Sequence, residues 1–289
     1  MVSPKKTSSG LSQRALLVAV NISQWTGRRL DRKATDAVND ANKAESTAGA
    51  YHKRLLPGAS ELQSVQTIAS QARKYYYENT LPWLADGTRI ISSKNYLNFT
   101  AEMRKIKGQF ETAVKDFSKA YPKLKTEAAR ALGDLYNSEE YPDSRDIGDK
   151  FSIEVSYLPI PDIKDFRVEV SEAEKRDFQR KMKAVESAAM RECWQRLATV
   201  VKTAADRLSS PDSIFRDSLI QNIQDVASIL PTLAVSDDAN LEATRLEVES
   251  IVSKLSPDTL RVNAGERTKA GKALADIEAR MGAFMGAAK

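Results

Sequence analysis

Apolar side chains recur at helical spacing along two long stretches of the chain. The first stretch runs from Phe99 to Tyr121 in steps of three and four residues, which is the period of one helix face. Pro122 interrupts the pattern, and it resumes over residues 124–135. Because proline is tolerated in the first turn of a helix and disrupts the interior, we expect either a kink or a fresh helix start at Pro122.

The second stretch carries apolar side chains at helical spacing over residues 178–208. Ser171 and Glu174 precede it with the spacing of a capping box, which predicts where this helix begins. Two stripes of this length in one chain favour an antiparallel helical pair resembling a coiled coil.

Between the two stretches the period changes from helical to alternating. Residues 151–157 alternate apolar and polar side chains, Pro159–Asp162 is typical of a turn, and residues 166–170 alternate again. The sequence therefore predicts a β-hairpin over residues 149–170, inserted at the tip of the helical pair.

The N-terminal part mixes strand and helix patterns. Ala15–Ile22 and Thr88–Ile91 are rich in β-branched and apolar residues, which predicts two strands that could pair. Helices are expected over residues 31–44 and from Ser60 to Tyr77, after a turn at Pro57 and Gly58.

Three more helices are expected at the C-terminal end. Their patterns cover residues 215–230, which Pro231 would end, residues 241–255 and residues 264–288. The fold class predicted from all these patterns is mainly α with small β elements.

The same patterns predict three consecutive domains. They are a basic, aromatic-rich α+β zone over residues 1–96, the helical pair with its hairpin over 97–210, and the C-terminal helices over 211–289.

Composition narrows the class of protein. The 289 residues are 42% hydrophobic and hold 44 basic against 39 acidic side chains, without a long apolar run or an export signal. We therefore expect a protein of a reducing cytoplasm with no membrane contact. A single cysteine excludes an intramolecular disulfide and any zinc site with several cysteines, and a single histidine excludes most metal and acid-base sites that use two imidazoles.

The candidate chemistry is sparse. His52 lies beside two cations, and Cys193 lies on an apolar helix face, so neither suggests a nucleophile with its base. The acidic run 139–149 matches no calcium loop, and residues 265–272 depart from the phosphate-loop spacing. We therefore expect no catalytic residue, no metal site, no cofactor and no enzymatic activity.

Charge is uneven along the chain. Residues 1–100 hold 14 basic and 7 acidic side chains, whereas residues 201–250 hold 4 basic and 9 acidic ones. Cations that follow phosphates, together with aromatic faces on which bases stack, are typical of surfaces that bind single-stranded nucleic acid. The candidate binding residues in the basic zone are Trp25, Arg28, Arg29, Lys53, Arg54, Arg73, Lys74, Tyr75 and Tyr77. Because successive helical positions are about 100° apart, at least one of the three consecutive tyrosines is expected to be exposed.

Residues 21–31, 76–83 and 87–90, followed by residues 151–170 and 215–219, form a further pattern along the chain. In this pattern the chain resembles a family of proteins of unknown function from tailed phages and integrative mobile elements. The resemblance implies a protein expressed in a bacterial cytoplasm, and it carries no site residues across.

Two functions remain open from the sequence. The first is non-catalytic binding of single-stranded DNA by the basic zone. The second is a helical module that self-associates or captures a protein partner, such as a host factor in counter-defence. The acidic stretch 201–250 favours the second, because it would repel phosphates unless it lay on another face.

Overall fold

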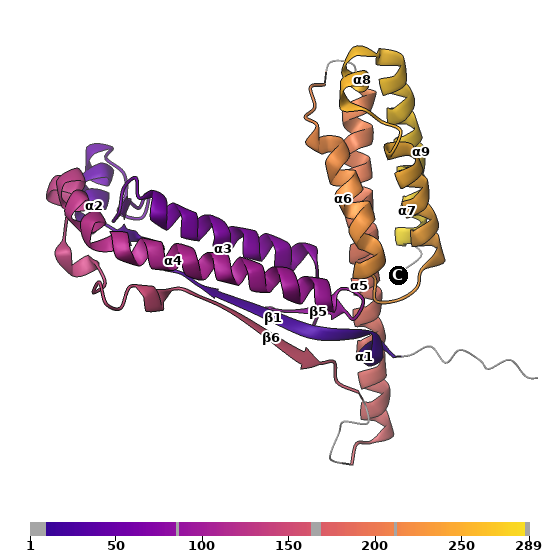
Figure 1. Cartoon of the computed structure of the whole chain (residues 1–289), viewed down its shortest axis with the longest axis horizontal. Coiled ribbons are helices and arrows are strands. Elements are labelled where there is room, and N and C mark those ends of the chain that lie inside the picture. The colour runs from indigo at the N-terminus through magenta and orange to yellow at the C-terminus, as the bar shows by residue number, and fades with distance from the viewer. Residues whose placement is uncertain (1–9, 85–86, 163–168, 211–212, 287–289) are drawn as a thin grey trace, which may run out of the picture. The chain divides into compact units, whose positions relative to one another are not determined.

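The computed structural model describes residues 10–84, 87–162, 169–210 and 213–286 (Figure 1). About 66% of it is helical and the remainder includes a small antiparallel sheet, which confirms the mainly α class with small β elements. The chain forms two compact units made of separated segments, unlike the three consecutive domains that the sequence predicts. The first unit comprises Met1–Ala19, Tyr77–Phe99 and Ser156–Lys289, and the second comprises Val20–Tyr76 and Thr100–Val155.

The four-stranded sheet contains the two N-terminal strands that the sequence predicts. Its order is β4 (Leu81–Pro82), β5 (Thr88–Ser92), β1 (Ala15–Ser23) and β6 (Ser152–Pro159). Strands β1 and β5 are antiparallel, with Leu17 opposite Ile90, so the expected pairing is confirmed. Fully buried β-branched side chains from both strands hold this pair: Val18, Ile90 and Ile91.

The described residues contain the first strand of the predicted β-hairpin. Its first strand is β6, but β6 joins β1 in the sheet. Most of the predicted return strand falls on residues 163–168, which lie outside the described residues, and Glu169 and Val170 are not in a strand. The alternating pattern identified a half-buried strand correctly, but a period of two cannot indicate which strand it joins.

A helical bundle dominates the first unit. Helix α5 (Glu172–Ser209) begins with the predicted capping box, because Ser171 and Glu174 bond reciprocally to each other's backbone N–H. It packs along α9 (Ala264–Gly286) and α6 (Ser218–Leu233) (Figure 1). The unit also contains α1 (Leu11–Arg14), α7 (Ala239–Val252) and α8 (Pro257–Val262).

The partner of α5 therefore differs from the expected one. The antiparallel pairing of the two long stripes is not confirmed, because the α5 stripe is buried against α9 and α6. At Gly271 of α9 an added Cβ would lie 2.9 Å from the backbone nitrogen of Ser209 at the end of α5. Only glycine allows the two backbones to approach so closely there. Helix α6 also continues through Pro231 to Leu233, where the sequence predicts an end.

The second unit is built on two long helices. Helices α3 (Ser60–Glu78) and α4 (Tyr96–Leu132) bury apolar faces, and α4 continues through Pro122 without a fresh start. Phe117 and Tyr121, fully buried just before the proline, form an aromatic cluster with Trp25 and Phe151. This packing offsets the roughly 3 kcal/mol that an interior proline costs a helix.

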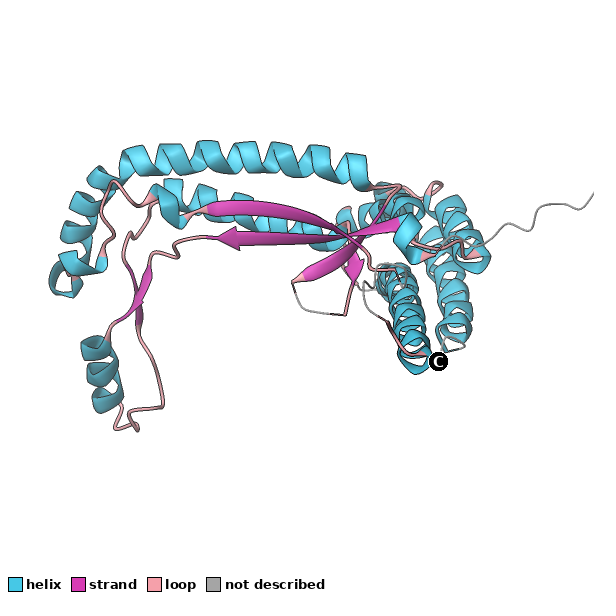
Figure 2. Cartoon of the chain, turned by 90° about the horizontal axis from the view of Figure 1, so that it is seen from below, coloured by secondary structure: helices cyan, strands magenta, loops and turns pink. Residues whose placement is uncertain are grey.

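The remainder of this unit is short elements. Figure 2 shows a narrow two-stranded ribbon that leads to a short helix. These elements are β2 (Arg28–Leu30), β3 (His52–Arg54) and α2 (Arg32–Ala41), and three 3₁₀ turns follow α4 at residues 133–135, 138–140 and 148–150.

We predict that Gly27→Ala destabilises the protein more than Gly58→Ala. Both glycines have positive φ, +62° at Gly27 and +79° at Gly58, so each alanine costs about 1 kcal/mol in backbone strain. At Gly27 the new Cβ would also lie 2.8 Å from Cδ2 of buried Leu62, whereas nothing lies within 4 Å at Gly58. Urea unfolding should show about 1 kcal/mol of additional loss for Gly27→Ala. Equal losses would contradict the close packing of Gly27 on α3.

Candidate nucleic-acid interface

The clearest concentration of exposed charge in the predicted basic zone lies on residues 28–54, which we call the basic arm. Strands β2 and β3 are antiparallel, and Arg28 lies directly opposite Arg54. Both arginines are exposed, as are Arg29 and His52. Like charges directly opposite each other destabilise a strand pair, so this register carries a cost that a bound anion would remove.

The basic arm also carries exposed apolar side chains. Leu30, Val38 and Tyr51 are 43%, 51% and 42% exposed. Within the described residues of the second unit these are the only large apolar side chains that are exposed, so they are confined to the arm. Apolar side chains gathered beside cations are typical of a surface that meets a partner.

Lys53 anchors the arm and is not part of its exposed surface. The side chain is only 4% exposed, and Nζ lies 2.8 Å from the Asp31 carboxylate and 2.9 Å from that of Glu140. Nζ also donates a 2.6 Å hydrogen bond to the carbonyl of Leu135. The sequence predicts Lys53 as a binding residue, but its ammonium is enclosed by two carboxylates, so we leave it out of the contact surface. Side chains alternate between the two faces of a strand, so residue 53 of β3 points away from residues 52 and 54. This alternation is a signal in the sequence that could have indicated the burial of Lys53.

Electrostatics at this anchor favour the charged forms. Burial on its own lowers the pKa of Lys53, but the hydrogen bonds and charges of Asp31 and Glu140 outweigh it and raise that pKa above its ordinary value. The hydrogen bond from Lys53, assisted by the backbone N–H of Ala34, lowers the pKa of Asp31. Both groups are therefore ionised at neutral pH.

Trp25 is half-buried at the base of the arm. Its ring meets Tyr121 edge-on at a centroid distance of 5.9 Å and Phe117 at 6.3 Å. Beside it, the backbone N–H of Leu55 donates to the carbonyl of Gly27, which joins the two sides of the arm. Trp25 therefore packs against the aromatic side chains of α4 and is only partly accessible to a base.

The remaining candidates lie at the end of α3 and do not join the arm in one surface. Lys74 is exposed, whereas Arg73 and Tyr75 are half-buried. Tyr76 is buried and Tyr77 is 54% exposed, which confirms that the three tyrosines cannot share one face. Tyr77 belongs to the first unit, where the guanidinium of Arg89 lies 4.9 Å from its ring centroid.

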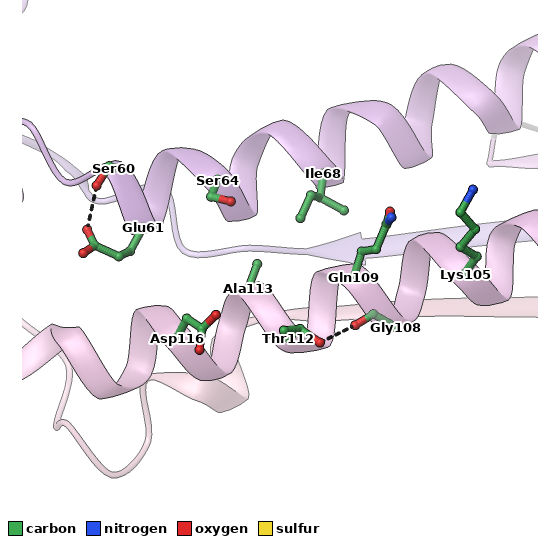
Figure 3. Close-up of a pocket in the computed structure, with 10 residues that line it drawn as sticks. All are labelled: Ser60, Glu61, Ser64, Ile68, Lys105, Gly108, Gln109, Thr112, Ala113 and Asp116. Atoms are coloured by element: carbon green, nitrogen blue, oxygen red, sulfur yellow. Dashed lines mark hydrogen bonds between the residues drawn. The ribbon is translucent and has the colours of Figure 1, made fainter.

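A groove of about 800 Å³ lies between α3 and α4 in the second unit (Figure 3). Figure 3 shows Ser60, Glu61, Ser64 and Ile68 of α3 across from the residues of α4. The α4 side comprises Lys105, Gly108, Gln109, Thr112, Ala113 and Asp116. The lining holds two carboxylates, one ammonium and several hydroxyl groups, and no histidine or cysteine. Within this lining the Ser60 hydroxyl donates a 3.1 Å hydrogen bond to the carboxylate of Glu61, its neighbour in sequence.

The other residues that the sequence analysis considered for chemistry are Cys193 and the acidic run 139–149. Cys193 is fully buried in the α5 stripe, and this burial raises the pKa of its thiol to about 12. The described part of the chain contains no group of three or more His, Cys, Asp or Glu side chains that could hold a metal ion. Within the acidic run, Glu140 pairs with Lys53 and Asp143 pairs with Arg145.

We predict that Cys193 is unreactive in the folded protein. Because its thiol is buried and protonated at pH 8, iodoacetamide should alkylate native protein at least about 100-fold more slowly than protein unfolded in urea. Mass spectrometry of timed samples measures both rates. Equal rates would mean that the α5 stripe is open to solvent.

We predict that Lys53→Met destabilises the protein by about 3 kcal/mol at pH 7, because it leaves two carboxylates without their shared ammonium. Because the pKa of Asp31 is lower in the folded protein than its ordinary value of 3.8, ionised Asp31 stabilises the fold at pH values above 3.8. This stabilisation is lost as the pH falls through the pKa of Asp31 in the folded protein. The difference between wild type and Lys53→Met should therefore narrow below pH 3.8. Urea unfolding at several pH values measures it, with exposed Arg54→Met as the control expected to change stability by less than about 0.5 kcal/mol. If the Lys53→Met protein were as stable as wild type, the ion pairs of Lys53 would not stabilise the attachment of the basic arm.

Comparison with protein-family models, with curated proteins and with solved structures finds no match to this chain. The resemblance to proteins of phages and mobile elements therefore stays a prediction. Among the described residues, no helix is both long enough and apolar enough to cross a membrane.

Proposed function

We propose that the protein binds nucleic acid without catalysis, and that the basic arm is the contact surface. The observation that carries the proposal is the exposed cross-strand pair of Arg28 and Arg54. In the described part of the chain neither guanidinium pairs with a carboxylate, so both are available to an external anion. Arginine binds phosphate bidentately through its planar fork, and two such forks side by side suit successive phosphates of a backbone.

The structure of the basic arm is compatible with binding to either duplex or single-stranded DNA. A two-stranded ribbon is one of the two protein elements that the major groove of a duplex admits. For a single strand, the exposed ring of Tyr51 beside His52 offers one face on which a base can stack. We retain single-stranded DNA as the proposed ligand, with phosphate contacts as the main contribution because Trp25 is half-buried and Tyr76 is buried. The proposed setting is a phage or mobile-element protein in a bacterial cytoplasm.

A protein-interaction module is the second candidate. The exposed Leu30, Val38 and Tyr51 favour it, because apolar side chains on an arm suit a protein partner or a second copy of this chain as well as a base. Salt dependence discriminates the two functions. Phosphate contacts weaken steeply with salt, whereas apolar contacts do not.

We predict that Arg28→Glu with Arg54→Glu reduces the affinity for a labelled 30-nucleotide strand at least about 100-fold at 50 mM salt, by removing two phosphate contacts and adding repulsion. Fluorescence anisotropy at 50 and 200 mM salt, with single strands and duplexes, measures affinity and strand preference. The control is Lys269→Glu with Lys272→Glu, which reverses two exposed cations of α9 and should bind as wild type does.

Two results would overturn the proposal. Wild-type protein that does not bind either strand form at 50 mM salt would remove the nucleic-acid function. Equal binding by wild type and the arginine variant would show that the arm is the wrong surface.

A further inference from the structure

The solvent face of α4 carries a stripe of cations that the basic arm does not include. Arg104, Lys115, Lys119 and Arg130, which we call the α4 stripe, are all exposed. On a helix these positions fall within an arc of about 80°, opposite the face that buries Phe110 and Phe117. The stripe therefore points directly away from the core of the second unit.

These four cations differ from three other lysines of α4 in that they have no ionic partner among the described residues. Lys105, Lys107 and Lys123 on the same helix pair with Glu102, Glu111 and Glu127 within one turn. Within the described residues no such pair involves any member of the α4 stripe. Local pairs thus neutralise the flanks of α4 and leave the outermost face positive.

The neighbouring helix does not oppose this charge. Between Glu61 and Glu78, α3 has no acidic residue, and its exposed positions are mostly serine, threonine and glutamine. Figure 3 shows Ser60, Ser64 and Ile68 of α3 along the groove beside α4, with Glu61 of α3 and Asp116 of α4 at one end. A polyanion along the α4 stripe would therefore meet few carboxylates from this side.

We propose that the α4 stripe is a second contact surface for the same nucleic acid, one that follows the phosphate backbone without reading its sequence. This inference rests on the function proposed above, and it adds that the affinity depends on the length of the nucleic acid. Arg104 to Arg130 spans ~39 Å by the helical rise. That distance corresponds to ~11 phosphates of one B-form strand, so the stripe adds affinity only for long ligands.

The test replaces Arg104, Lys115 and Lys119 together with glutamine, a good helix former, and keeps Arg130 because it also stabilises the helix C-terminus. The matched control is Lys183→Gln, Lys269→Gln and Lys272→Gln, three exposed helical cations of the first unit. Both triple variants lose three charges and should unfold at the wild-type temperature. Anisotropy is measured with 8- and 30-nucleotide strands and duplexes at four salt concentrations.

We expect the stripe variant to lose the advantage that wild type has for 30 over 8 nucleotides. The slope of log affinity against log salt should become shallower by about 2 for single strands and by about 2.7 for duplexes. An unchanged slope and length dependence would overturn the stripe while leaving the arm intact. Loss of binding in the stripe variant but not in the arm variant would support the stripe and overturn the arm.

Two further outcomes would overturn the inference. Wild-type protein that does not bind an oligonucleotide of either length would remove the proposed function and the stripe together. Wild-type protein that binds poly-L-glutamate through these residues but no oligonucleotide would assign the stripe to an acidic protein partner.

Discussion

The shared ammonium of Lys53 is the contact on which the basic arm depends. It joins Asp31 at the start of α2 and Glu140 in the turns after α4, so segments distant in sequence meet at one buried charge. An alanine at position 53 would leave the carboxylates of Asp31 and Glu140 without a cation. If the Lys53 side chain pointed into solvent instead, the basic arm would lose its attachment to the turns after α4. Because a buried ion pair costs desolvation as well as gaining attraction, its main effect is geometric. It holds β3 in the register that sets Arg28 opposite Arg54.

Other cations of the chain also form contacts within the fold and are not available to a ligand. In the first unit, Arg196 donates to the backbone carbonyls of Tyr77, Glu78 and Thr80, and so satisfies the end of α3. Arg267 donates to three carbonyls near the end of α5 in the same way. These arginines replace the hydrogen bonds that helix ends lack. The number of basic residues therefore overstates the positive charge that a ligand can contact. Only cations that do not form ion pairs or hydrogen bonds within the fold can form a binding surface.

Close packing imposes the other main constraint. Small side chains on α5, among them Ala189 and Ala204, and Gly271 on α9 allow the two helices to approach. The fully buried Cys193 is one more small apolar side chain in that interface, which explains its place without any chemistry. In the second unit the aromatic cluster around Tyr121 has the corresponding role, and it buries part of Trp25.

Elements with a local cause follow from the amino-acid sequence alone. Helical periods located α3, α4 and α5, the spacing of Ser171 and Glu174 located the start of α5, and β-branched runs located β1 and β5. Tertiary structure alone decided which apolar stripe covers which, because every stripe has the same period and the same chemistry. It also decided which cations are free. Lys53 and Arg54 are neighbours in one basic run, yet one is enclosed by carboxylates and the other is exposed, because side chains alternate across a strand and only the fold supplies what lies on each side.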